Sequence, residues 1–368
     1  MTGDFFLTQW FFLGMRWLCE NVVSGNVFLT ILLSTLILRL ITLFSDIKQR
    51  KNTMKTAQIQ PEVEKLQKRY KDNPQKLQQE QQKLMKENGI SMFSGCLPTI
   101  LTLVLLFCFI AAFRFWGYEQ NVKMINEMSS NIAEAMREEG LADESESSVD
   151  CILKLKDMSE DERKSFLASS NIEISKTFTD SKFLWINNIW QPDNGFSPVV
   201  TEANTFFGAN YKSTKKLIYF KEHKDIKQEM TDLGIFYDET EGYDDLSKDE
   251  QNKLKENAAA VYEILMTPLE KVHEGHNNGW FILPVLATLF QVLYMLYTQK
   301  SMKTTQSSAQ PGASTANFML WTMPIMSFFF CLSYTSAFAL YWTLSSIMML
   351  IINMILSKVF NNKKQTVK

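Results

Sequence analysis

Four long apolar blocks constrain the fold of this 368-residue chain more than any other feature. They cover residues 27–47, 96–116, 280–298 and 318–360. A helix needs about 20 apolar residues to cross a hydrocarbon layer about 30 Å thick, so each of the first three blocks predicts one crossing. The fourth is about twice as long and carries a polar cluster, Ser333–Ser336, near its middle, which predicts a tight hairpin of two crossings. The sequence therefore predicts an all-α polytopic membrane protein with five transmembrane helices.

The first 26 residues show no secretory signal pattern, because Asp4, and no Lys or Arg, precedes the first apolar residues. Large apolar side chains recur at roughly helical spacing between residues 4 and 22, with Gln9, Arg16 and Glu20 among them. This pattern predicts an amphipathic helix that lies in the membrane interface. A sixth crossing is the alternative, which Arg16 and Glu20 disfavour because they shorten the apolar run.

The charges of the loops predict the orientation. Residues 46–87 hold eleven Lys/Arg against six Asp/Glu, and the last loop and the tail are also basic. Residues 117–279 hold eighteen Lys/Arg against thirty-two Asp/Glu. Because short basic loops stay in the cytoplasm, the chain is expected in the cell membrane with its N-terminus outside and its C-terminus in the cytoplasm.

The spans and loops together predict a division of the chain into nine segments. From the N-terminus, these are an interfacial helix at 1–26, the first span at 27–47, a cytoplasmic helical hairpin at 48–95, the second span at 96–116 and an acidic extracellular insert at 117–279. They continue with the third span at 280–299, a cytoplasmic loop at 300–317, the last two spans at 318–360 and a basic cytoplasmic tail at 361–368.

Residues 48–95 are expected to form two antiparallel helices. Apolar residues at 54, 59, 63, 66 and 70 mark one face of the first helix, and Leu77 and Leu84 mark one face of the second. Asn73 followed by Pro74 predicts the turn, since Asn caps a helix and Pro fits its first turn. Gly89 is expected to end the second helix. The hairpin either offers a charged surface to a nascent chain, a ribosome or lipid headgroups, or serves only as a solvated connector.

The insert at 117–279 is too long for a simple connector. Ser159 with Glu162 and Ser247 with Glu250 have the spacing of capping boxes that open helices. We expect helices over 119–138 and 250–271, a short strand over 216–219, and partial order overall. His273 and His276 lack a third ligand, and the five cysteines show no paired spacing, so the sequence predicts no metal, no cofactor and no disulfide framework.

One face of the first span is polar. Thr35, Arg39, Thr42 and Asp46 follow one another at intervals of four, three and four residues, which places them along one side of a helix. An arginine at mid-membrane costs about 3 kcal/mol on insertion scales, so a compensating group is expected. The other spans contain no Asp or Glu. Arg39 is therefore expected to meet water, carbonyl groups or an incoming acceptor, in a hydrophilic cavity.

Other spans supply polar and aromatic groups that can face such a cavity. They are Thr288, Gln291, Tyr341, Trp342, Thr343, Ser345, Ser346 and Asn353. The alternative is that Arg39 only extends to the inner headgroups. The polar stripe disfavours this alternative, because a snorkelling arginine needs no polar companions. Arg114, close to Trp116 at the outer edge of the second span, is expected to act as a snorkelling anchor.

The ordered motifs of the membrane portion resemble the YidC/Oxa family of membrane protein insertases, of the Gram-positive YidC type. The resemblance covers residues 27–116, 183–192 and 280–360, and each motif alone is weak, whereas their shared order is specific. The motifs are Thr35-x-x-x-Arg39, Lys48-Gln49-Arg50, Gln60-Pro61-Glu62, residues 68–76, Gly95-Cys96-Leu97-Pro98, residues 183–186, residues 282–286, residues 323–326 and Leu340-Tyr341-Trp342.

The resemblance implies five helices around a hydrophilic groove that is open to the cytoplasm and to lipid. The family's groove arginine falls on Arg39, its threonine on Thr35 and its last-helix aromatic on Trp342, with Gln291 a looser match. It also implies nascent membrane proteins, the ribosome, the Sec translocon and the phospholipid bilayer as partners, without a specific nucleic-acid site. Residues 117–182 and 193–279 depart from the family, which usually has a short hairpin there.

Two other classes of function are alternatives to insertion. A solute transporter or channel, with Arg39 as an anion site, predicts internal repeats or broken helices, and the sequence shows no repeat. An intramembrane protease needs a buried Asp pair or a Ser with a His within the spans, and neither is present. Insertion needs no covalent step, so the sequence predicts a protein that is not an enzyme.

Overall fold

The computed structural model describes residues 6–90, 97–203, 218–236, 246–303 and 313–365. The chain divides into two compact units. The insert unit comprises Met1–Val27 and Ala111–Trp280, and the span unit comprises Phe28–Ile110 and Phe281–Lys368. Throughout the described residues the regular elements are helices, and β-pairing is limited to two isolated bridges, Phe183–Ile186 and Pro198–Asn277. The all-α prediction is confirmed for this part of the chain.

The span unit contains α2 (Val27–Arg69), α3 (Pro74–Glu87), the first part of α4 (Leu97–Glu138), α12 (Ile282–Lys303), α13 (Ala313–Ser333) and α14 (Ser336–Gln365). Helix α12 packs along α14 and against α13. Helix α13 ends at Ser333 and α14 begins at Ser336, so the helix breaks inside the predicted polar cluster. Over the described residues, Val27–Lys48 and Ser336–Val359 are long and apolar enough to cross a membrane, while Ile282–Thr298 and Trp321–Ser333 are shorter apolar stretches. Five crossings stay a prediction.

Side chains of α2 are distributed opposite to those of a helix in water. Leu40, Ile41 and Phe44 are 61–77% exposed, whereas Thr30 and Thr35 are fully buried. In water such a surface is unfavourable, because exposed apolar area raises the free energy of the folded state. In lipid it is favourable, since the tails solvate the apolar face and the polar groups find partners inside the protein.

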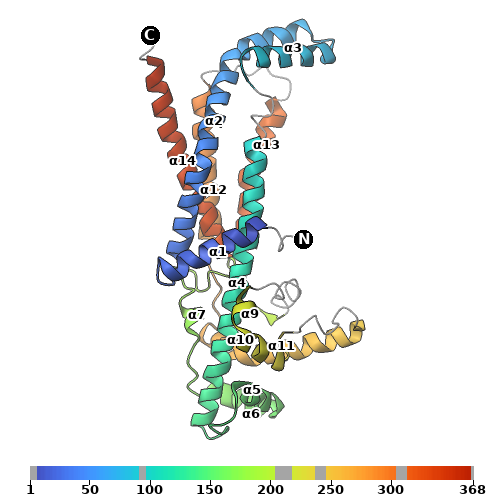
Figure 1. The fold of residues 1–368 in the computed structure, drawn as a ribbon, viewed down its shortest axis with the longest axis vertical. Helices are drawn as coiled ribbons and strands as arrows, with labels where there is room; N and C mark the ends of the chain where they lie inside the picture. Colours follow the sequence, from blue (N-terminus) through green and yellow to red (C-terminus); the bar gives the residue numbers. More distant parts are fainter. Residues whose placement is uncertain (1–5, 91–96, 204–217, 237–245, 304–312, 366–368) are drawn as a thin grey trace. The chain divides into compact units, whose positions relative to one another are not determined.

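Helix α2 continues past residue 47 without a break, so the first span and the first hairpin helix form one helix of 43 residues. The turn follows as predicted: the Asn73 side chain accepts a hydrogen bond from the Lys76 N–H at 3.1 Å, and Pro74 opens α3. Figure 1 shows α3 folded back beside the end of α2. Ile59, Val63 and Ile90 are buried between them. Gly89 ends the hairpin in the left-handed region at φ +65°, as its position predicted.

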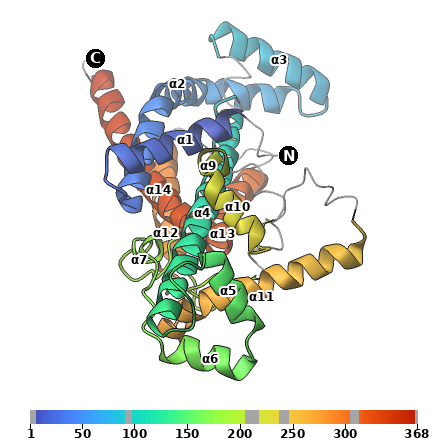
Figure 2. The same cartoon turned by 60° about the horizontal axis from the view of Figure 1, so that its bottom comes forward.

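The insert unit contains α1 (Phe6–Asn21), the later part of α4, α5 (Ser148–Asp157), α6 (Glu160–Ser169), α7 (Lys176–Thr179), α9 (Ile218–Glu222), α10 (Lys224–Asp232) and α11 (Lys248–Val272). Figure 2 shows α5 and α6 beside α4 and α11. Both predicted capping boxes are present, at Ser159 and Ser247. A third, in which Ser147 pairs with Asp150 at the start of α5, was not predicted.

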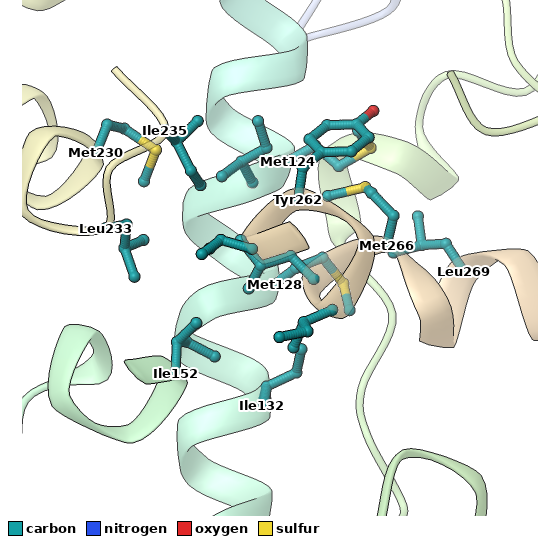
Figure 3. Close-up of a cluster of buried hydrophobic side chains, with 14 of the residues drawn as sticks. Met124, Met128, Ile132, Ile152, Met230, Leu233, Ile235, Tyr262, Met266 and Leu269 are labelled. Atoms are coloured by element: carbon teal, nitrogen blue, oxygen red, sulfur yellow. The ribbon is translucent and has the colours of Figure 1, made fainter. Parts of the chain in front are cut away.

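One expectation for the insert needs correction. The predicted strand at 216–219 is wrong at residues 218–219, which belong to α9, while 216–217 lie outside the described residues. Both long insertions contribute to one hydrophobic core in the described residues, which the sequence did not predict. Figure 3 shows Met128 and Ile132 of α4 packed with Ile152 of α5 and with Tyr262 and Met266 of α11. The sequence pattern missed this core because its residues come from helices far apart in the chain.

Helix α1 confirms the helix predicted within residues 4–22, and it is apolar on two faces. Phe12, Met15 and Cys19 are buried, whereas Phe6, Trp10 and Trp17 are 59–66% exposed. Arg16, which the sequence presented as an interruption, lies 2.6 Å from Glu222 and 3.5 Å from the fully buried Glu119. Lys123 also pairs with Glu119, at 3.0 Å. These ion pairs tie α1 to α4 and α9.

Candidate functional site

The candidate site lies in the span unit, on the polar face of α2. Thr35 is fully buried and its hydroxyl donates to the Ile31 carbonyl at 2.6 Å. The Thr42 hydroxyl donates to the Arg39 carbonyl at 3.3 Å. Because each hydroxyl is satisfied within its own helix, both threonines can sit in an apolar environment without a partner on another helix. The predicted stripe is therefore present on α2.

Arg39 is half-buried and reaches α14. Its guanidinium donates a hydrogen bond to the Ser345 hydroxyl, while its Nε has no hydrogen-bond partner. Among the described residues no carboxylate lies within 4.0 Å of it, since all the recorded ion pairs belong to the insert unit. Asp46, further along the same helix, interacts with Arg39 electrostatically. A guanidinium with a neutral hydroxyl as partner retains capacity for an anionic or carbonyl acceptor.

Tyr341 belongs to the same cluster. It is buried, shares a hydrogen bond with Ser345 and interacts electrostatically with Arg39. The ring of Phe109, on α4, stacks on the Tyr341 ring with centroids 4.8 Å apart. The sequence named Ser345 only as one of several polar groups that can face the cavity, and it did not predict Phe109. The pairing of Ser345 with Arg39 depends on how α2 and α14 pack, so spacing along one helix could not single it out.

Gln291 and Trp342 are half-buried, and each keeps one buried polar atom without a partner. Gln291 lies on α12 between two contacts with α14: the Thr343 hydroxyl reaches the Leu283 carbonyl at 3.5 Å, and the Asn353 amide donates to the Thr298 hydroxyl at 2.7 Å. This register places Gln291 at the level of residues 343–353 of α14. No hydrogen bond joins Gln291 or Trp342 to Arg39 in the described part of the chain.

The unsatisfied atoms define what the site can do. They are the Ser34 hydroxyl, the Arg39 Nε, the Gln291 Oε1 and the Trp342 Nε1. A buried polar atom without a partner costs about 1–3 kcal/mol, so each gains free energy when a guest supplies the missing donor or acceptor. Donors, an acceptor and a cation within apolar helices suit a polypeptide with carbonyl and carboxylate groups better than an apolar ligand.

Two further features lie outside this cluster. A cleft of about 300 Å³ lies between the hairpin helices. It is lined by Glu62, Lys65, Leu66, Arg69, Glu80, Lys83, Leu84 and Glu87. Within the described ranges no three His, Cys, Asp or Glu side chains are grouped as metal ligands. In the same ranges no disulfide joins Cys19, Cys108, Cys151 or Cys331. Arg114, predicted as an anchor at the outer edge, is exposed on α4 and hydrogen-bonded to Tyr118.

Comparison with known proteins covers most of the chain. The sequence model of the 60Kd inner membrane protein family matches residues 18–236 and 243–364. A membrane protein insertase YidC of Clostridium perfringens is 49% identical over 85 residues, which is 23% of this chain and 36% of that protein. The YidC of Clostridium tetani is 40% identical over 97 residues, 26% of this chain and 44% of the relative. The YidC of Chlorobium limicola is 39% identical over 94 residues, 26% of this chain and 16% of the relative.

These matched segments span less than half of the length of each relative, whereas the family model reaches from the end of α1 to the last turn of α14. The chain is a membrane protein that belongs to the 60Kd inner membrane protein family, the YidC/Oxa family that its ordered motifs indicated.

Proposed function

We propose that this protein is a membrane protein insertase and chaperone, which inserts newly made membrane proteins and helps them to fold. The observation that carries the proposal is the state of Arg39, a guanidinium among apolar helices with Ser345 as its partner and an unsatisfied Nε. Family membership and the similarity to YidC proteins support it. Insertion of this kind forms no covalent bond, so the protein acts without enzyme catalysis.

The proposed architecture has five transmembrane helices, formed by α2, α4, α12, α13 and α14. The basic hairpin and tail lie in the cytoplasm of a cell-membrane protein, and the acidic insert lies outside. Helix α1 lies in the outer interface with Phe6, Trp10 and Trp17 toward the lipid. The groove opens to the cytoplasm and to the lipid, and Arg39, Thr35, Thr42, Gln291, Tyr341 and Trp342 line it.

In the proposed mechanism an emerging hydrophobic segment first meets the hairpin. The cleft between its helices carries both charges, which suits transient contact with a polar nascent chain. Polar or acidic residues of the guest's short external tail then partition into the groove. There the Arg39 guanidinium exchanges Ser345 for the guest's acceptor, which lowers the desolvation cost of the tail. The hydrophobic segment moves along the lipid-facing side of the helices into the bilayer.

The partners that follow are nascent membrane proteins, the ribosome that delivers them, the Sec translocon and the phospholipid bilayer. The protein acts either alone or together with the translocon. It recognises the guest polypeptide and has no specific nucleic-acid site.

Reconstitution of the purified chain in liposomes tests the function. The guest is a single-span protein with a short acidic external tail, and protease protection of that tail measures insertion. We expect protection above the level of protein-free liposomes. Uptake of small anions in place of protected tails would identify a solute transporter and contradict the proposal.

A further inference from the structure

In the insert unit, the buried carboxylate of Asp193 joins residues 185–193 to the residues just before α12. Asp193 is fully buried, and its Oδ1 accepts a hydrogen bond from the Trp280 backbone N–H at 2.8 Å. Its Oδ2 accepts from the Trp185 indole Nε1 at 3.2 Å. The two bonds join residues 185–193 to the segment that enters α12. A buried carboxylate needs such donors, because an unpaired one is strongly destabilising.

Asn278, two residues before Trp280, adds hydrogen bonds between the same two segments. The bonds of Asp193 and Asn278 are together called the clasp. Its Oδ1 accepts from the Asn188 N–H at 2.7 Å, and its Nδ2 donates to the carbonyls of Asn188, Gln191 and Pro192 at 2.8–3.1 Å. Gly279 lies between Asn278 and Trp280, and a Cβ there would lie 2.0 Å from Asp193 Oδ1 and 2.9 Å from Asp193 Cα. The chain is therefore packed tightly at this point, and the clasp is rigid.

The clasp presents three large apolar side chains outward. Leu184, Phe196 and Trp280, here called the rim, are 79%, 72% and 74% exposed. Leu184 has φ +51°, a left-handed backbone that a branched side chain rarely adopts. The backbone of Phe196 is held because the Asn194 side chain accepts from its N–H at 3.1 Å. Partly buried hydrogen bonds hold the backbone at Phe196 and at Trp280, and exposed large apolar side chains fixed in this way mark a surface for an apolar partner.

The position of Trp280 identifies that partner. It precedes by two residues Ile282, where α12 and its apolar stretch to Thr298 begin. A residue so close to the start of a membrane helix lies within a helical turn of the hydrocarbon boundary, where tryptophan is enriched. Exposed Lys182 lies two residues before Leu184, close enough in the chain to meet lipid phosphates. Asp193, which accepts from the Trp280 N–H, is buried and so does not oppose an anionic surface. Exposed Asp180 offsets the charge of Lys182, so it is the apolar side chains and the position of Trp280 that indicate a lipid partner.

We propose that Leu184, Phe196 and Trp280 form a rigid anchor that enters the outer headgroup region of the phospholipid bilayer and holds the clasp of the insert unit there. This role is separate from insertion. The proposal assumes that α12 is a membrane helix, as in the proposed function, and it does not depend on the groove around Arg39. Its partner is the lipid surface itself.

Tryptophan quenching in lipid vesicles tests the anchor. The full chain is reconstituted in phosphatidylcholine and phosphatidylglycerol with bromine on the acyl carbons nearest the headgroup, which quenches indoles at that depth. Leu184→Trp and Phe196→Trp each add an indole at the rim, and Trp280→Phe removes one. Leu141→Trp is the matched control, since Leu141 is exposed in the same unit just beyond the end of α4.

The brominated lipids are expected to quench the added emission of Leu184→Trp and Phe196→Trp, and Trp280→Phe should lose quenchable emission. The added emission of Leu141→Trp should instead respond to aqueous acrylamide. Rim indoles that respond to acrylamide as Leu141→Trp does would overturn the anchor. Rim indoles shielded from both quenchers would also overturn it, because they would be covered by a protein. A protein-insertion assay on the same vesicles reads the groove separately.

Discussion

At the scale of single residues, the buried polar groups differ in whether their hydrogen bonds are satisfied. Arg39 has the Ser345 hydroxyl and keeps a free Nε. Asp193 has an indole and a backbone N–H. Sequence spacing alone predicted that Arg39 shares a helix face with Thr35 and Thr42, because the period of a helix is fixed. It could not predict that Ser345 is the direct partner of Arg39, nor the bonds of Asp193, since both depend on which helices and loops meet in space.

Gly279→Ala is expected to destabilise the insert unit. The added methyl group would overlap Asp193 Oδ1 and crowd its Cα, so the clasp must open or shift. We expect a loss of about 1–3 kcal/mol, the usual range for overpacking. Thermal unfolding followed by circular dichroism measures the loss. Gly14→Ala in α1, where a Cβ meets nothing within 4 Å, is the control and should unfold at the wild-type temperature or above it.

His273 is expected to make the insert unit less stable in mild acid. Burial, together with the charges of Lys182 and His276, lowers the pKa of His273 below its ordinary value of 6.5. As the pH falls through 6.5, the imidazole takes up a proton in the unfolded chain before it does so in the folded unit. The unfolded state then binds more protons, so stability falls between 6.5 and the lower folded pKa.

The measurement compares unfolding temperatures at about pH 7.5 and about pH 5.5, on either side of the ordinary histidine pKa. His273→Asn should reduce the decrease that the wild type shows. His276→Asn, at an exposed position, should retain most of it. An equal decrease in the wild type and in His273→Asn would exclude His273 as the cause.

At the scale of elements, local signals in the sequence placed several helix ends correctly. Ser159, Ser247 and the Asn73–Pro74 turn open helices where their residue types predicted. The Ser147 box was missed because its third residue is Asp150 and not the usual Glu or Gln. The predicted strand was wrong at residues 218–219 because packing overrode the β propensity of a short run: Tyr219 and Phe220 are buried in the core from helix α9.

Ser147→Ala is expected to lower the free energy of unfolding of the insert unit by about 1 kcal/mol, the usual cost of losing an N-cap. The Ser147 hydroxyl accepts from the Asp150 N–H at 3.1 Å, at the start of a helix whose Cys151, Ile152 and Leu155 are fully buried. Chemical denaturation measures the change. Ser145→Ala, at an exposed position before the cap, should have no effect, and an equal cost for both substitutions would contradict the capping role.

At the scale of the whole molecule, the apolar residues have two roles. They face outward on helix α2 of the span unit, and they form the core of the insert unit. Hydropathy blocks predicted the helices of the span unit, where apolar side chains of α2 face outward. The same measure missed the core of the insert unit, because Met, Ile and Leu there alternate with charged residues on amphipathic helices. Both insertions, before and after residues 183–192, share this one core. We therefore expect the insert unit to unfold in a single transition.

Ile132→Ala and Leu265→Ala test this unity. Both side chains are fully buried, one on α4 and the other on α11. Each substitution is expected to lower the same unfolding transition by about 2–5 kcal/mol, the range for large-to-small changes in a core. Leu141→Ala, at an exposed position, is the control. Separate transitions for the two variants would show that the insertions fold as independent domains.

We propose that the groove recognises its guest through the charge of Arg39. The most direct measurement is insertion into liposomes of a series of guests that differ in the number of acidic residues in the external tail. Arg39→Ala should reduce insertion of the acidic guests about tenfold or more, because a hydrogen bond to a charged group contributes about 1.5–3 kcal/mol. Arg39→Lys should retain most of it, and Arg114→Ala, the control arginine, all of it. Wild-type insertion of every acidic guest by Arg39→Ala would contradict the claim.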